Sequence, residues 1–219
     1  MRGGAVTFLS MLLFAAASGC SRGGNHSTKS PFHPGNSPAS IAQLPAAAAS
    51  GRIFLTKTQL SQALASGTVD RPIKSLLAVD RPLTYGEYKW NDTAIPDGPT
   101  WVRIDLGTQL ISVFRAGHEI GTSVIVYGGD NKQTPVGKLH ILAKARDHRS
   151  SLYDASMPYT LRLTNDGVSI HGSAVRWGAA THGCIGVPLD FARRLFDATK
   201  IGDEVIILPA NPGPTSRTS

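Results

Sequence analysis

Short runs of alternating apolar and polar residues dominate the chain from position 100 onward, and this pattern constrains the fold most. The first two runs are Trp101–Leu106 and Leu110–Arg115. A period of two places successive side chains on opposite faces, as in a β-strand. Further strands are expected at 119–126, 138–143, 160–163, 168–171 and 204–208. Short strands at this spacing predict a mainly β domain of the sandwich or barrel-like kind over residues 100–208.

One segment of this region has the helical period instead. Residues Leu189–Phe196 carry apolar side chains at positions 191, 192, 195 and 196, which lie together on one face of a helix. This predicted helix begins shortly after Cys184. The N-terminus of a helix favours negative charge, so the placement matters for the chemistry of that thiol.

The stretch 51–99 is expected to be a small, partly helical segment. Thr56 or Thr58 can cap a helix that ends at Gly67, and a second short helix is expected over 73–79. Proline, glycine and aspartate then cluster at 91–99, which is typical of a loop and of a domain boundary.

The beginning of the chain resembles a bacterial export signal. An apolar run at 5–17 is too short for a membrane span and suits a signal peptide over residues 1–19. The following cysteine, Cys20, stands where bacterial lipoproteins carry their lipid. Residues 20–50 are rich in proline, serine and glycine and lack acidic residues, which predicts a disordered linker. A flexible tail is expected at 209–219.

The chain is basic, with 22 lysines and arginines against 15 acidic residues and a formal charge of +7. This balance favours anionic surroundings such as acidic lipid or a cell-wall polymer. Nucleic acid is not expected as a partner, because the basic residues are scattered along an exported chain. We assume a monomer.

The chain has only two cysteines, and lipid on Cys20 would leave Cys184 without a disulfide partner. The second cysteine ends the run Thr181-His182-Gly183-Cys184, and His171-Gly172 precedes this run. A nearby histidine activates a thiol as a nucleophile, and glycine lets the backbone approach a substrate closely. The peptide N–H groups of Gly183 and Cys184 are candidates for stabilising an oxyanion. Either His171 or His182 is a candidate base.

These motifs resemble the YkuD family, the L,D-transpeptidase catalytic domains also described with the ErfK/YbiS proteins. The resemblance rests on four blocks in the family's order, which together span about residues 100–208. The blocks are the strands 102–106 and 110–115, the segment Thr134–Ile141, the run from Met157-Pro158-Tyr159 to His171-Gly172, and Thr181–Ile185. The resemblance implies mixed sheets, a helix after the catalytic cysteine, and no cofactor or metal.

The implied activity is acyl transfer on the stem peptides of peptidoglycan. Cys184 would attack the carbonyl before the terminal D-alanine, release that D-alanine and form a thioester, which an amine of a second stem or of a protein would resolve. His171 would be the base, oriented by a backbone carbonyl near Gly172, and His182 would shape the surroundings of the thiol. Gly183 and Gly172 would serve the oxyanion and the orientation of the base.

The sequence departs from the family at Gly186, where members usually carry arginine or asparagine. Arg176 is a candidate to replace the missing contact, and Gly186→Arg would be the first replacement to try in an inactive protein. Candidates for lining the substrate site are Tyr153, Tyr159 and Thr181.

Three other functions remain open at this point. A lipid-anchored wall-binding protein without turnover would keep the fold, and an L,D-carboxypeptidase would resolve the same thioester with water. Zinc held by Cys184, His182 and His171 is chemically possible, although no Cys-x-x-Cys or His-Glu-x-x-His pattern occurs.

The expected location is the periplasmic side of a bacterial membrane, as a lipoprotein of the outer membrane.

Overall fold

The structure is a computed structural model and describes residues 51–66, 69–129, 132–150 and 154–210. The predicted signal peptide, Cys20, the linker up to residue 50, Tyr153 and most of the predicted tail lie outside the described residues. Within the described part, no helix is long and apolar enough to cross a membrane.

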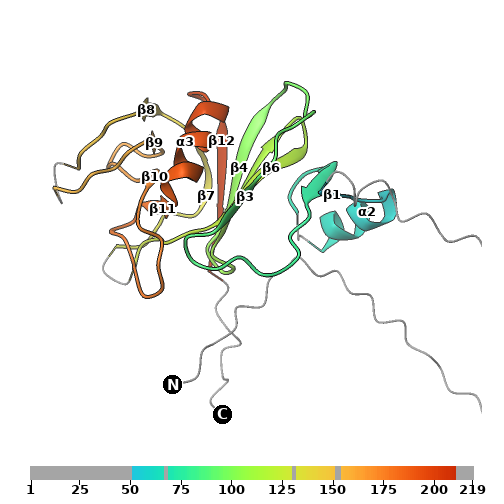
Figure 1. The fold of residues 1–219 in the computed structure, drawn as a ribbon, viewed down its shortest axis with the longest axis horizontal. Helices are drawn as coiled ribbons and strands as arrows, with labels where there is room; N and C mark the ends of the chain where they lie inside the picture. The colour runs from blue at the N-terminus through green and yellow to red at the C-terminus, as the bar shows by residue number, and fades with distance from the viewer. Residues whose placement is uncertain (1–50, 67–68, 130–131, 151–153, 211–219) are drawn as a thin grey trace, which may run out of the picture.

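The described chain is built around two β-sheets (Figure 1). The larger sheet has the order β1-β2-β6-β5-β4-β12-β7, and β3 pairs with β6 beside this path. Its strands are β1 (Arg52–Phe54), β2 (Ser75–Leu77), β3 (Tyr88–Trp90), β4 (Thr100–Asp105), β5 (Leu110–Arg115), β6 (His118–Val124), β7 (Gly137–His140) and β12 (Glu204–Leu208). The smaller sheet has the order β11-β10-β9-β8, with the strands β8 (Ala143–Ala145), β9 (Thr160–Arg162), β10 (Ser169–Gly172) and β11 (Ile185–Val187).

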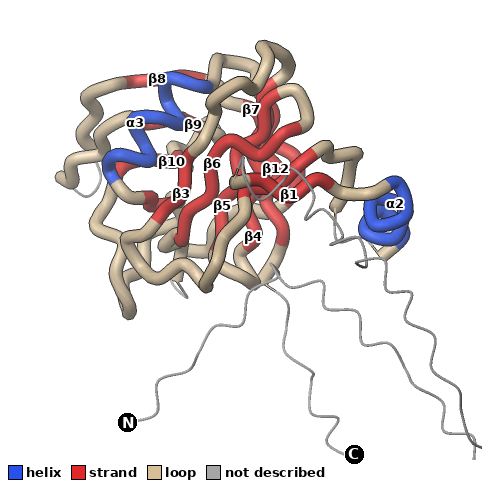
Figure 2. The backbone as a smooth tube through the Cα atoms, turned by 45° about the vertical axis from the view of Figure 1, so that its right-hand side comes forward, coloured by secondary structure: helices blue, strands red, loops and turns tan. Residues whose placement is uncertain are grey.

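Both sheets mix parallel and antiparallel pairs. β12 runs parallel to β4, and β10 runs parallel to β11, whereas β4, β5 and β6 form an antiparallel meander. The smaller sheet and helix α3 (Leu189–Ala198) lie on one side of the larger sheet, and helix α2 (Lys57–Ala65) lies on the other, near β1 (Figures 1 and 2). The predicted mainly β fold with mixed sheets and a helix after Cys184 is confirmed.

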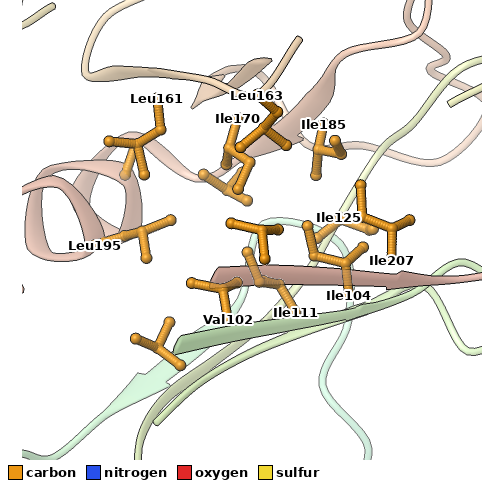
Figure 3. Packing of buried hydrophobic residues seen from close by; sticks show 14 of the residues in the cluster. Val102, Ile104, Ile111, Ile125, Leu161, Leu163, Ile170, Ile185, Leu195 and Ile207 are labelled. Carbon is orange, nitrogen blue, oxygen red and sulfur yellow. The ribbon is translucent and has the colours of Figure 1, made fainter. Parts of the chain in front are cut away.

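The main hydrophobic core fills the space between the two sheets. Figure 3 shows residues of the smaller sheet and α3 facing residues of the larger sheet across this space. Those from the first side include Leu161, Ile170, Ile185 and Leu195, and those from the second include Val102, Ile104, Ile111 and Ile207. All of these side chains are almost completely buried. The backbone of both sheets is therefore fixed by apolar packing at the strands that carry the candidate site.

Helix α2 confirms the capped helix expected near Thr56. The Thr56 hydroxyl accepts a hydrogen bond from the Gln59 N–H, and the Gln59 side chain accepts one from the Thr56 N–H, which is a capping box. The helix predicted over 73–79 is wrong, because this stretch contains strand β2. Buried Ser75 and Leu77 alternate there with half-buried Leu76, and β2 pairs with both β1 and β6.

The larger sheet continues into the segment 51–99 through β1, β2 and β3. The single strand expected at 138–143 is two strands, β7 and β8, and they belong to different sheets. The chain leaves the larger sheet at Ile141, whose N–H donates to the Asp203 carbonyl, and joins the smaller one at Leu142, whose N–H donates to the Arg162 carbonyl. An alternating pattern does not reveal such a change of sheet.

Candidate active site

Two neighbouring parallel strands bring His171 and Cys184 to the same cleft. His171 lies on β10, and Cys184 immediately precedes β11. The register places His171 opposite Gly186, two residues after the cysteine. Both side chains line a cleft of about 450 Å³. The remaining residues of its wall are Lys132, His148, Ser150, Ala155, Met157, Arg162, Asn165, Asp166, Gly167, Val168, Thr181 and His182.

The buried imidazole of His171 is held in one orientation by its own strand. Its Nδ1 lies 3.0 Å from the carbonyl oxygen of Gly172, and because a carbonyl only accepts hydrogen bonds, Nδ1 carries the proton. The other ring nitrogen, Nε2, is therefore the one with a free lone pair. Burial lowers the pKa of His171, more than the Gly172 carbonyl opposes this, and nearby His148 adds to the lowering. His171 is consequently a neutral base at neutral pH.

The Cys184 thiol is partly buried and donates a long hydrogen bond, 3.8 Å, to the carbonyl of Gly167. Burial raises the pKa of this thiol and Asp166 contributes in the same direction, whereas the Ser169 N–H and the Lys132 charge oppose the change. The resting site is thus a neutral thiol beside a neutral imidazole. Such a pair needs proton transfer from sulfur to His171 before the sulfur becomes a good nucleophile.

Two threonine hydroxyls fix the backbone around the nucleophile. Buried Thr134 accepts a hydrogen bond from the Gly128 N–H at 2.9 Å and donates one to the Gly183 carbonyl at 3.0 Å. The hydroxyl of Thr181 donates to the carbonyl of Cys184. The Gly183 carbonyl shares a peptide plane with the Cys184 N–H and points the opposite way, so Thr134 also fixes the direction of this N–H group.

Glycine is required at two positions of this loop for different reasons. Gly183 has φ +96°, a conformation in which other residues are strained. Gly186 is a matter of space, since a Cβ there would lie 2.7 Å from Cγ2 of Val126 and 2.9 Å from Cβ of Ser173. Main-chain hydrogen bonds also join Gly186 to Val126 in both directions, at 2.8 and 3.0 Å. The Gly186→Arg replacement suggested by the sequence would therefore have to displace the side chains of Val126 and Ser173.

Helix α3 begins at Leu189, where the sequence predicts it, but a strand separates this start from the cysteine. Strand β11 lies between Cys184 and the start of α3 at Leu189. At about 3.3 Å per extended residue, this separation exceeds the first helical turn, over which the helix dipole acts strongly. Residues of the loops therefore set the electrostatics of the thiol, rather than the helix.

The structure places the other predicted residues in different surroundings. Exposed His182 and half-buried Thr181 line the cleft. Arg176 is exposed and is not part of the cleft wall, and the Tyr159 ring packs edge-on against Phe196 of α3, with the two centroids 5.8 Å apart. The Gly172 N–H donates to the Pro158 carbonyl at 2.8 Å, so the Met-Pro-Tyr block holds the base strand in place.

Sequence reasoning missed four ionisable residues of the cleft wall and the role of Thr134. Lys132, His148 and Asp166 come from three separate loops and Arg162 from strand β9, and no local pattern marks them as site residues. Thr134 stands in a recognised block, but only the three-dimensional structure reveals its two hydrogen bonds. Among the residues that the structure describes, no group of three or more histidine, cysteine and acidic side chains could hold a metal ion.

Comparisons with known proteins agree with the motifs. A family model described as the L,D-transpeptidase catalytic domain, YkuD, matches residues 99–207. L,D-transpeptidase 1 of Mycobacterium tuberculosis is 27% identical over 120 residues, which cover 47% of this chain and 48% of that protein. The chain thus spans about half the length of the curated relatives it matches.

Solved structures of L,D-transpeptidases are also similar. One from Stackebrandtia nassauensis is 24% identical with a TM-score of 0.48, over 57% of this chain and 61% of that one. One from Mycobacterium smegmatis is 21% identical with a TM-score of 0.48, over 50% and 58%. The family predicted from the sequence is confirmed by the match over 99–207: this chain belongs, through those residues, to the YkuD family of L,D-transpeptidase catalytic domains.

Proposed function

We propose that the protein is a peptidoglycan L,D-transpeptidase that works through a thioester on Cys184. The observation that carries this proposal is the neutral pair in the cleft, a thiol and an imidazole whose Nε2 is free to take the proton. The family supplies the reaction class. The chemistry requires a nucleophile, a base and oxyanion donors, and therefore no cofactor.

The first half-reaction acylates the enzyme. His171 Nε2 takes the thiol proton while sulfur attacks the carbonyl that joins the third stem residue to the terminal D-alanine. The N–H groups of Gly183 and Cys184 stabilise the oxyanion. The hydrogen bond from Thr134 to the Gly183 carbonyl keeps the Cys184 N–H pointing in one direction. The C–N bond then breaks, and His171 returns the proton to the amine of the departing D-alanine. The product is a thioester on Cys184.

The second half-reaction transfers the acyl group. An acceptor amine enters the cleft, His171 takes its proton, and the amine attacks the thioester carbonyl. The C–S bond breaks and the proton passes to sulfur, which restores the neutral thiol. An amine of a second stem gives a cross-link, an amine of a protein attaches that protein to the wall, and water gives a trimmed tripeptide.

The proposal includes export and anchoring, for which the N-terminal sequence is the support. A signal peptide over 1–19 and lipid on Cys20 would place the catalytic domain on the periplasmic side of a bacterial membrane, as an outer-membrane lipoprotein. The linker 20–50 would let the domain reach the peptidoglycan stems.

The test is incubation of the purified chain with disaccharide-tetrapeptide, followed by mass spectrometry of the intact protein and of the products. The proposal predicts an acyl adduct, free D-alanine and dimer with the wild type and none of these with Cys184→Ser. Tripeptide without dimer would instead indicate an L,D-carboxypeptidase. A folded wild-type protein that gives neither adduct nor product would contradict the proposal and favour a wall-binding protein.

A further inference from the structure

An ion pair crosses the cleft beside the nucleophile. Lys132 stands in the segment that leads to β7, and Asp166 stands in the turn between β9 and β10. Their Nζ and Oδ2 atoms are 3.7 Å apart. Both residues line the same cleft as Cys184. The proposed mechanism uses neither of them.

The Lys132 side chain runs alongside the residue that precedes the nucleophile. Its Cγ and Cε lie 3.4 and 3.5 Å from the position that a Cβ on Gly183 would take. The Lys132 N–H donates a hydrogen bond to the Gly129 carbonyl at 3.2 Å. The lysine charge lowers the pKa of the Cys184 thiol and the Asp166 charge raises it, as expected for two opposite charges near the sulfur.

The pair is held loosely enough to exchange partners. The Lys132 side chain is 37% exposed and that of Asp166 is 67% exposed, so water screens their attraction. Asp166 also accepts a hydrogen bond from the Thr164 hydroxyl at 2.5 Å, which keeps the carboxylate at its position in the turn. A second carboxylate that enters the cleft therefore competes for the lysine on nearly equal terms.

We propose that Lys132 binds a carboxylate of the substrate beside Cys184, and that Asp166 is the resting partner which this carboxylate displaces. The proposal rests on the proposed function, because the donor stem ends in the free carboxylate of D-alanine, one residue beyond the attacked carbonyl. One residue spans at most about 3.6 Å. The Lys132 Cε lies 3.5 Å from the Cβ position of Gly183, which is the residue next to Cys184, so the lysine stands about one residue from the nucleophile.

The other cationic and titratable groups of the wall have different positions. Arg162 lies on β9, His148 lies between β8 and β9, His171 lies on β10, and His182 stands two residues before Cys184. Of these groups, Arg162 is the one with a permanent positive charge, so it could also attract a carboxylate into the cleft. It therefore serves as the comparison within the cleft.

The experiment compares two alkylating reagents on the full chain, anionic iodoacetate and neutral iodoacetamide. Modification of Cys184 is followed by peptide mass spectrometry, which separates it from Cys20. The ratio of the two rates reports the attraction of a carboxylate to the thiol. We expect Lys132→Met to lower this ratio about fivefold, as for the loss of one charge at contact range in a solvated site. Lys132→Arg should keep the ratio, and Asp166→Asn should raise it.

Two controls make the result specific. Lys138→Met removes an exposed lysine of β7 that is not in the cleft wall and should leave the ratio unchanged. Arg162→Met should lower the ratio by less than Lys132→Met does. An unchanged ratio in Lys132→Met, an equal fall in Arg162→Met, or a fall in Asp166→Asn would overturn the proposal.

A steady-state measurement connects this charge to the substrate. With tetrapeptide donors that end in D-alanine or in D-alaninamide, Lys132→Met should raise KM about fivefold for the acid only and leave kcat similar. Equal effects on both donors would also overturn the proposal. Alkylation requires no turnover, so a chain without transpeptidase activity can still show the predicted ratio. In that case the proposed function fails and the carboxylate site stands.

Discussion

Two groups of buried ionisable residues lie at the two ends of β6, and they use burial in opposite ways. At the start of the strand, Arg52 donates to the Ser75 hydroxyl at 2.9 Å, to the Asn91 carbonyl at 3.0 Å and to the Glu119 carbonyl, and the Glu119 carboxylate accepts from the Leu77 N–H at 2.8 Å. Past the end of the strand, His171 and Cys184 form a neutral pair.

The difference shows what burial does to an ionisable group. A guanidinium remains charged in proteins, so Arg52 must collect acceptors from several strands and thereby ties β1 and β2 to β6. An imidazole and a thiol avoid the cost of burial by staying neutral. In the proposed mechanism the thiol proton moves to this imidazole, so the first group holds strands together and the second would carry out the chemistry.

The largest effect is expected from removing the proton acceptor of the pair formed by His171 and Cys184. His171→Ala should lower kcat/KM for acyl transfer by about 10³-fold or more, because His171 takes the thiol proton in the proposed mechanism. The melting temperature should change little. His140→Ala, which removes an exposed histidine of β7, is the matched control. Retention of a tenth of the activity in His171→Ala would show that another group is the base.

The next largest effect is expected from removing the guanidinium of Arg52 from its buried contacts with Ser75, Asn91 and Glu119. Arg52→Met should reduce the free energy of unfolding by about 3–5 kcal/mol, because it removes three hydrogen bonds of a buried guanidinium and the positive charge that acts on buried Glu119. Urea unfolding measures this loss, and Arg193→Met on the exposed face of α3 is the control. A loss below about 1 kcal/mol would mean that the arginine does not hold these strands together.

A smaller effect tests the close approach at Gly186. We expect Gly186→Ala to cost about 1–3 kcal/mol and Gly186→Arg to cost at least as much without a gain in activity, because even a Cβ overlaps Val126 and Ser173. At Gly129 a Cβ would lie 3.4 Å from Ala180, so Gly129→Ala should be tolerated in the same unfolding assay. Increased activity in Gly186→Arg would restore the interpretation made from the sequence.

Thr134 separates alignment from proton transfer at the candidate site, because its hydroxyl holds the backbone next to Cys184 but takes no proton. Thr134→Val should lower kcat about 10- to 100-fold, as expected for about 1–3 kcal/mol lost with its two hydrogen bonds, whereas Thr134→Ser should keep most of the activity. Equal activity of the valine and serine variants in steady-state assays would show that the Thr134 hydroxyl does not align this loop.

The smallest expected effect concerns the pH dependence of the structural group. Burial raises the pKa of Glu119 despite the opposing contacts with Ser112, Leu77 and Arg52. A raised folded-state pKa means that stability falls as the pH rises from the unfolded value, about 4.3, through the folded one. Melting curves should therefore show the wild type losing stability relative to Glu119→Gln between pH 4 and pH 8. A relative gain over this range would contradict the direction of the shift.

Strong local patterns predicted much of the fold, and weak ones did not. The strands β4, β5 and β12 are five or six residues long, and the sequence predicts them at nearly their observed bounds. Strands β2 and β11 have three residues each, too few for a period to show, and their pairing comes from the neighbouring strands.

The candidate site divides in the same way. Cys184 and His171 stand in a recognisable motif, so the sequence predicts both. Lys132 and Asp166 meet only because two distant loops fold over the same cleft. Gly186 looks like a missing side chain in the sequence, but in the structure the side chains of Val126 and Ser173 occupy the space that a Cβ there would need. Contacts between loops that are distant in the sequence leave no local sequence pattern, so the sequence does not predict them.

The most direct test of the account is the pH dependence of Cys184 alkylation by iodoacetamide, without substrate, between pH 5 and pH 10. The neutral pair predicts a slow rate below pH 7 and a rate that rises with pH through the ordinary cysteine range, about 8.5, and beyond it. A fast plateau between pH 5 and pH 7 would show a preformed thiolate and imidazolium and would contradict the neutral resting site.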